Sequence, residues 1–220
     1  MIGALAQAAA ALDAPRYAEA AARAAAFILT RMRTPDGRLL RTWSAGAPPK
    51  LNAYLEDYSF VIDGLVSLYE ATFAPRWVEA ALALADVMVN QFWDDVGGGF
   101  FYTGRDHEAL IARGKDPHDN ATPSGNAMAV TGLLRLVKLT GRRDLQAEET
   151  RHVLRAVRTG FRPNQVVALK APGATEGEDL LPLLAGKEAR GAVTTYVCRD
   201  FTCQAPLVGA EATEAALAQG

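Results

Sequence analysis

Cysteine and histidine are both scarce in this sequence of 220 residues, which has two cysteines and three histidines. Two cysteines are too few for the disulfide framework of a small secreted domain. Cys198 and Cys203 do not have the C-x-x-C spacing of a dithiol redox site, and no histidine or third cysteine lies near enough to complete a zinc site. Two reduced cysteines in a packed segment are the favoured interpretation, and a disulfide or redox pair is the alternative.

The sequence also has no run of positive charge and no long apolar segment. Its 23 basic residues are scattered among 25 acidic ones, so neither nucleic acid nor an anionic membrane is an expected partner. No apolar stretch is long enough to span a bilayer. The apolar start, residues 1–7, has no basic residue before it, and it predicts the remainder of an amphipathic helix rather than a signal peptide. The expected location is therefore the cytoplasm.

An internal repeat indicates the architecture. Residues 11–21 match residues 71–81 at an offset of 60 residues, and a weaker third copy lies at residues 139–145. Pro15 and Pro75 fall where a helix would begin. Since turn residues follow each copy, a unit reads as a helix, a short turn, a second helix and a longer loop.

Apolar residues recur at the three- and four-residue steps of helices in three segments. They are expected to form the hydrophobic core, and they are Val61, Leu65, Leu68 and Thr72; Trp77, Ala81, Leu84, Met88 and Phe92; and Val130, Leu133, Leu134 and Val137. Between the helices, residues 38–43 and 99–103 read as short strands or hairpin arms.

Together these patterns predict a mainly α fold. Repeated helical hairpins close into an α/α toroid or stack as a solenoid, and three hairpins would form only part of a six-hairpin toroid. We expect the hairpins to span residues 1–157. Residues 158–220 are expected to form a small α/β appendage, with strands at residues 165–169 and 192–198 and a short helix at residues 179–184.

The first candidate site is the polar start of the helix expected after residue 54. Glu56, Asp57 and Asp63 are candidate catalytic carboxylates, suited to general acid and base catalysis or to hydrogen bonds with sugar hydroxyls. The alternative for Glu56 and Asp57 is that they stabilise the positive end of the helix dipole. Asp63 lies among apolar residues, so it needs a partner or water if it is buried. The candidate substrate-binding aromatics here are Trp43, Tyr54 and Tyr58.

The second candidate site is the polar segment of residues 115–126. Thr122 reads as a helix N-cap and Pro123 as the first helical residue. Free backbone N–H groups in the first turn are then available to a ligand, and the alternative is an elaborate capping loop. His118 is the candidate general acid or base, whereas His107 and His152 are expected at the surface. The candidate substrate-binding residues are Asp119, Asn120, Ser124 and Asn126.

Four segments occur in an order that resembles a known family. They are residues 37–43, residues 53–65, the octapeptide DNATPSGN at residues 119–126, and residues 196–206. They resemble the helical region of the thioredoxin-domain-containing family related to spermatogenesis-associated protein 20. The resemblance covers nearly the whole chain, and the octapeptide is its most specific part.

The resemblance implies a six-hairpin α/α toroid, similar to the N-acylglucosamine 2-epimerases and certain glycosidases. It also implies a thioredoxin-like domain before the helical region. That domain and the first hairpins are missing from this sequence, because residue 1 already falls within a repeat helix. Further helices are missing before residue 161. The expectation is a shortened product or a fragment.

Three functions follow from these patterns. The first is a carbohydrate-binding or carbohydrate-processing region with a central pocket, which as an enzyme would be a sugar epimerase, isomerase or hydrolase. Epimerases of this fold are thought to use a histidine pair, and His118 supplies only one member. The second is a non-catalytic scaffold for a thioredoxin-like partner domain, and the third is a degenerate fragment. No cofactor and no metal are expected.

Overall fold

The computed structural model is mainly α-helical, as the sequence predicts. It describes residues 1–108, 112–116, 118–141, 180–188, 194–196, 198–199 and 202–208. The helices within them are α1 (Ile2–Ala11), α2 (Pro15–Arg31), α3 (Leu55–Thr72), α4 (Arg76–Phe92) and α5 (Gly125–Thr140). None of these helices is both long enough and apolar enough to cross a bilayer.

Short strands accompany the helices. Strands β1 (Leu40–Thr42) and β2 (Lys50–Asn52) form an antiparallel hairpin, in which Leu40 pairs with Asn52. The last described elements are the 3-10 turn η2 (Pro182–Leu184) and the strands β3 (Thr194–Thr195), β4 (Cys198–Arg199), β5 (Thr202–Cys203) and β6 (Leu207–Val208). Strand β3 pairs with β6, and β4 pairs with β5, both antiparallel.

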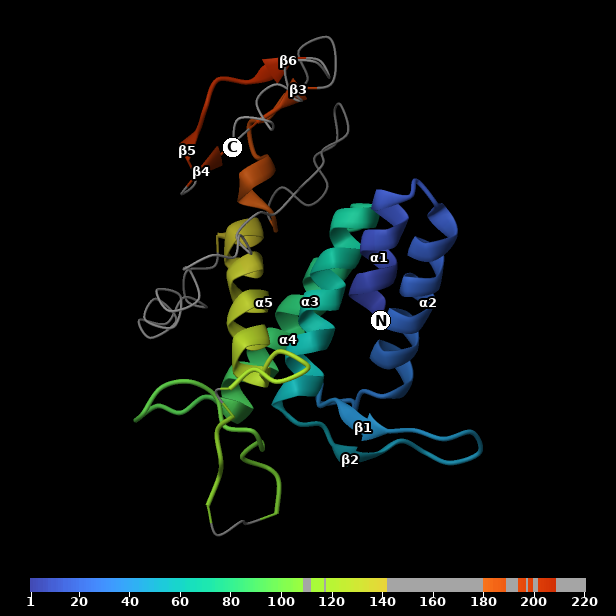
Figure 1. Ribbon diagram of the computed structural model, residues 1–220, viewed down its shortest axis with the longest axis vertical. Helices are drawn as coiled ribbons and strands as arrows, with labels where there is room; N and C mark the ends of the chain where they lie inside the picture. The colour runs from blue at the N-terminus through green and yellow to red at the C-terminus, as the bar shows by residue number, and fades with distance from the viewer. Residues whose placement is uncertain are drawn as a thin grey trace.

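Helix α3 is the centre of the helical part (Figure 1). It packs against α1 on one side, against α5 on the other, and against its hairpin partner α4. The long connections, residues 32–54 and the described parts of residues 93–124, lie at one end of the helices, which is the lower end in Figure 1. That end holds the starts of α3 and α5, so the two polar segments of the sequence lie at the same end.

The repeated positions take the structural roles that the repeat predicts. Pro15 is the first residue of α2, and Pro75 is the N-cap of α4. The five residues of the apolar stripe on α4, from Trp77 to Phe92, are all buried. The closed toroid, to which these hairpins would belong, stays a prediction.

Glycines allow α3 to approach both of its neighbours closely. A Cβ atom on Gly64 of α3 would lie 3.3 Å from the Cβ of Ile2 on α1. On α5, a Cβ on Gly132 would lie 3.0 Å from Cγ2 of Ile62, and one on Gly125 would lie 3.2 Å from Cδ2 of Leu55. Because a methyl group at any of these positions would meet a contact tighter than usual, the glycines allow the helix axes to lie this close.

The C-terminal elements differ in detail from their predictions. The predicted helix at residues 179–184 is only the 3-10 turn η2, and the predicted strand at residues 192–198 is divided between β3 and β4. Leu181 and Leu184 are buried in the same core as the helices. The predicted strand at residues 165–169 and the domain boundary after residue 157 lie outside the described residues and stay predictions.

Two details of the loops were predicted incorrectly or missed. The N-cap of α5 is Ser124, not Thr122, because Oγ of Ser124 accepts a hydrogen bond of 3.1 Å from the N–H of Ala127. Strand β2 was missed. Residues 99–103 form a hairpin arm through a single antiparallel bridge, between Phe100 and Trp93.

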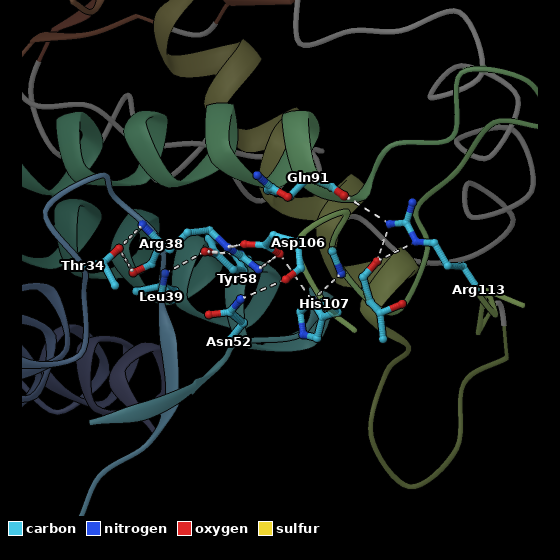
Figure 2. Close-up of polar contacts among 11 residues, drawn as sticks. Thr34, Arg38, Leu39, Asn52, Tyr58, Gln91, Asp106, His107 and Arg113 are labelled. Carbon is cyan, nitrogen blue, oxygen red and sulfur yellow. Dashed lines mark hydrogen bonds and ion pairs between the residues drawn. The ribbon is translucent and has the colours of Figure 1, made fainter. Parts of the chain in front are cut away.

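A buried guanidinium connects the chain before β1 to α3 and to the loop after Phe100 (Figure 2). Arg38, which is 5% exposed, donates to the Tyr58 hydroxyl at 2.6 Å and to both Asp106 carboxylate oxygens at 2.6 and 2.7 Å. The N–H of Leu39 also donates to the Tyr58 hydroxyl, at 2.7 Å. Burial by itself would lower the pKa of Arg38, but the hydrogen bonds to Asp106 and Tyr58 outweigh it and raise the pKa.

The glycine contacts predict that alanine has opposite effects on stability at Gly132 and at Gly3. Alanine at either of these positions gains up to about 1 kcal/mol of helix propensity. We expect Gly132→Ala to destabilise the fold by about 1 kcal/mol or more, because its methyl group would crowd Ile62 in the core. Gly3→Ala meets only ordinary contacts, at 3.6 Å or more, and is expected to be neutral or stabilising. Urea unfolding of both variants measures the difference, and equal effects would contradict the close packing.

Removing the buried guanidinium of Arg38 should lower the free energy of unfolding far more than removing an exposed guanidinium. Arg38→Ala leaves Asp106 without its guanidinium partner and removes one of the two donors to the Tyr58 hydroxyl, so we expect the free energy of unfolding to fall by about 3 kcal/mol. The control is Arg23→Ala, since Arg23 pairs with Glu19 at 4.0 Å with both side chains at least 70% exposed. This change is expected to cost less than about 0.5 kcal/mol. Chemical denaturation measures both values, and a small loss for Arg38→Ala would show that the network is dispensable.

Candidate functional site

A small pocket lies between the starts of α3 and α5. Its volume is about 50 Å³, and its polar lining includes Glu56, Tyr102, Asp116, His118, Asn120 and Asn126. This volume holds a few water molecules and is far below the roughly 300–1,000 Å³ of a site that encloses a whole drug-sized ligand. The pocket therefore has room for one polar group of a larger ligand.

The two polar segments of the sequence meet at this pocket because α3 and α5 nearly touch at their starts. A Cβ atom on Gly125 would lie 3.4 Å from the backbone nitrogen of Glu56. The first turns of both helices consequently border the same space. Backbone N–H groups in a first turn have no helical partner, and they carry the positive end of the helix dipole.

Glu56 forms one wall of the pocket and is held in place from two sides. Its Oε1 accepts hydrogen bonds from Nη2 of Arg41 at 3.0 Å and from the Tyr102 hydroxyl at 3.2 Å. Its other carboxylate oxygen has no hydrogen-bond partner among the described residues. Burial and the nearby negative charge of Glu56 raise the pKa of Tyr102, so this hydroxyl remains a donor.

Asp57 caps the start of α3, a structural role at the same helix end as the dipole interaction that was the alternative to catalysis. Its Oδ2 accepts a hydrogen bond from the N–H of Tyr54 at 2.8 Å and one from Nη1 of Arg41 at 2.9 Å. Burial raises the pKa of Asp57, although the Tyr54 N–H and Arg41 oppose the shift. Asp57 is not part of the pocket lining, and its contacts stabilise the start of α3.

Asp63 lies away from the pocket, on the face of α3 that packs against α5. Arg135 of α5 donates a hydrogen bond to the Asp63 carboxylate and another, at 3.2 Å, to the Asp63 carbonyl. The same guanidinium donates to Ser67 at 3.1 Å and to Glu70 at 2.6 Å. The partner that a carboxylate in this apolar stretch requires is therefore an arginine from the neighbouring helix.

The three candidate aromatic residues lie in different environments. Trp43 is 47% exposed and packs edge-on against Phe27, with ring centroids 5.0 Å apart. Tyr58 is fully buried in the Arg38 network. Only Tyr54 borders the candidate site, because its ring stacks on Tyr102 at 4.9 Å.

Most polar side chains of the second segment hold the loop in shape. Asp119 accepts a hydrogen bond from the N–H of Ser124 at 2.8 Å. The amide of Asn126 bonds to both backbone groups of Phe100, at 2.8 and 2.9 Å. The side chains of His118 and Asn120, by contrast, have no hydrogen-bond partner among the described residues, so they remain available to a ligand.

His107 was expected at the surface, and that expectation is wrong. Its side chain is only 12% exposed, it stacks on Tyr54 at 5.1 Å, and its Nδ1 accepts a hydrogen bond from the N–H of Gly104 at 3.0 Å. Figure 2 shows His107 beside Asp106. The polar neighbours of His107 suggest an exposed turn. The hydrogen bonds from Arg38 to the adjacent Asp106 instead hold this turn against the fold. His152 lies outside the described residues.

Other residues of the site were missed by the sequence analysis. Arg41 lies in one of the segments that resemble the family but was given no role, yet it binds both Glu56 and Asp57, and its Cζ lies 4.6 Å from the centre of the Tyr54 ring. Tyr102 lies in a segment interpreted only as a hairpin arm. Neither the resemblance nor the alternation along a three-residue strand indicates which residues Arg41 contacts.

The structure joins Cys198 and Cys203 in a disulfide. The favoured interpretation of two reduced cysteines is therefore wrong for this structure, and a redox role stays a prediction. No group of three or more potential metal ligands occurs in the part of the chain that the structure describes.

Comparison with known proteins shows clear relatives, although no family model matches the chain. The chain is 29% identical to human (Homo sapiens) spermatogenesis-associated protein 20 over 227 residues, which covers 78% of this chain and 29% of the human protein. It is 44% identical to the Rattus norvegicus protein of the same name over 120 residues, which covers 50% of this chain and 15% of that protein. This chain is a relative of spermatogenesis-associated protein 20.

A third relative supports the same assignment. The Mus musculus spermatogenesis-associated protein 20 is 39% identical over 153 residues, which covers 66% of this chain. The chain spans less than a third of the length of these relatives. Their name states no reaction and no ligand.

Asp94, in the loop after α4, has contacts that lower the pKa of its carboxyl group. Lys115 donates to Oδ2 of Asp94 at 2.5 Å, and this contact, together with the N–H groups of Val96 and Gly97, lowers the pKa of Asp94 to about 2 from an ordinary 3.8. Because the folded-state pKa is depressed, ionised Asp94 stabilises the fold above pH 3.8, and this contribution is lost as the pH falls through about 2.

An NMR titration of the Asp94 carboxyl carbon measures this pKa directly. In Lys115→Met we expect it to rise toward 3.8, and in the control Lys50→Met we expect it to stay near 2. A wild-type value close to 3.8 would mean that Lys115 does not hold the loop.

Proposed function

We propose that this chain is a binding module for a small hydroxylated ligand such as a sugar. One polar end of the ligand enters the pocket between the starts of α3 and α5. The observation that carries the proposal is that Glu56, His118 and Asn120 line one pocket while keeping hydrogen-bonding atoms without partners among the described residues. They come from two segments of the chain that are about 60 residues apart.

The lining suits a hydroxyl group because a hydroxyl both donates and accepts hydrogen bonds. Glu56 offers an acceptor, the Asn120 amide offers both a donor and an acceptor, and a neutral His118 offers one of each. Tyr102 adds an aromatic ring at the wall. A pocket of about 50 Å³ takes only one end of a hexose, so the rest of the ligand would lie outside it.

Binding is better supported than catalysis by this chain. Two of the candidate catalytic carboxylates, Asp57 and Asp63, are engaged by Arg41 and Arg135 outside the pocket. His118 and Glu56 remain, and an epimerase would need a matched acid and base facing each other across the substrate. A sugar epimerase, isomerase or hydrolase therefore stays a prediction. So does a scaffold for a thioredoxin-like partner domain.

The proposal is tested by titrating the ¹⁵N-labelled chain with glucose and N-acetylglucosamine. We expect saturable shifts of the Glu56, Asn120 and Gly125 amide signals. Glu56→Gln and Asn120→Ala should each weaken binding about tenfold, since a hydrogen bond to a charged or well-placed polar group contributes about 1–2 kcal/mol.

The matched control is Glu79→Gln, because Glu79 is an exposed glutamate in the first turn of α4, outside the pocket lining. It should bind like the wild type. If no sugar shifts these amides, or if the control loses as much affinity as Glu56→Gln, the pocket is not a sugar site.

A further inference from the structure

We propose that the Cys198–Cys203 disulfide is a site of thiol–disulfide exchange with an external dithiol, and not a structural staple. The inference is independent of the ligand pocket, because the two cysteines lie on strands β4 and β5 near the other end of α5 (Figure 1).

The bond connects residues that the backbone already holds together. Cys198 and Cys203 are direct partners in the β4–β5 ladder, and Arg199 pairs with Thr202 beside them. Among the described strands, β4 and β5 pair only with each other. The disulfide therefore joins only two strands that already pair with each other.

The bond also closes a very short loop. The two cysteines are five positions apart, and the entropy that a cross-link removes from the unfolded chain grows with the length of the loop it closes. A disulfide of this span therefore restricts the unfolded chain less than one that closes a long loop. The helical core, which is built from α1 to α5 with Leu181 and Leu184, contains neither cysteine.

The disulfide lies at a partly exposed part of the surface. Cys198 and Cys203 are only partly buried, and their neighbours Thr202 and Gln204 are exposed. Exchange requires an attacking thiolate to reach a sulfur along the disulfide axis, so partial exposure is a condition for it. A disulfide that is partly exposed and lies outside the helical core is suited to exchange.

The reaction is a two-electron transfer. A thiolate of the external dithiol attacks one protein sulfur, the protein S–S bond breaks, and the other cysteine leaves as a thiolate that takes a proton from water. The second thiol of the reagent, as its thiolate, then attacks the reagent sulfur of the mixed disulfide and releases the first cysteine. The protein disulfide is reduced to two thiols, and the dithiol is oxidised to a disulfide.

The test measures reduction of the whole chain by dithiothreitol. Samples are quenched with acid and alkylated, and mass spectrometry counts the labelled cysteines over time. We expect the folded chain to be reduced within about tenfold of its rate in concentrated urea, where the disulfide is fully accessible. Protection by about a hundredfold or more in the folded chain would overturn the proposal.

A second measurement separates exchange from a structural role. The double variant Cys198→Ser, Cys203→Ser should keep the thermal midpoint of the helical signal at 222 nm, because the hairpin adds nothing to the helical core. A marked fall in that midpoint would identify the disulfide as a staple. Failure of the reduced wild type to re-form the bond with oxidised glutathione would also overturn the proposal.

Discussion

The close approach of α3 and α5 is the constraint on which the rest of the structure depends. Gly125 and Gly132 allow the two helices to pack closely, with Leu55 and Ile62 of α3 against the glycine positions of α5. Because both helices start at the end where the long loops gather, this contact places Glu56 beside the loop of residues 116–124. The candidate site is thus a consequence of helix packing.

The loops at that end are fixed mainly by polar contacts with the helices. Arg38 links the chain before β1 to Tyr58 and to Asp106, and Asn126 bonds both backbone groups of Phe100. Each contact satisfies groups that would be costly to bury alone. The hydrogen bonds of these side chains stabilise the fold. Glu56, His118 and Asn120, which keep hydrogen-bonding atoms without partners among the described residues, are the ones that a ligand would meet.

The sequence predicts the helices well because burial repeats with the helical period. The stripe from Trp77 to Phe92 and the helix starts at Pro15 and Pro75 needed no knowledge of distant contacts. The sites were harder, because the role of a carboxylate depends on which cation reaches it. Arg41 and Arg135 determine the surroundings of Asp57 and Asp63, and Arg38 buries the turn that carries His107. These pairings join positions 16 to 72 residues apart, and no local pattern indicates them.

The most direct test of this account is a nuclear Overhauser measurement between the two helix starts. In methyl-labelled protein, we expect a strong cross-peak between the Leu55 methyl groups and the Gly125 Hα protons, and another between the Ile62 Cγ2 methyl group and the Gly132 Hα protons. Observing both would place the starts of α3 and α5 around one pocket. If neither appears while the cross-peaks between α3 and α4 do, the two polar segments do not share a site, and the central claim is wrong.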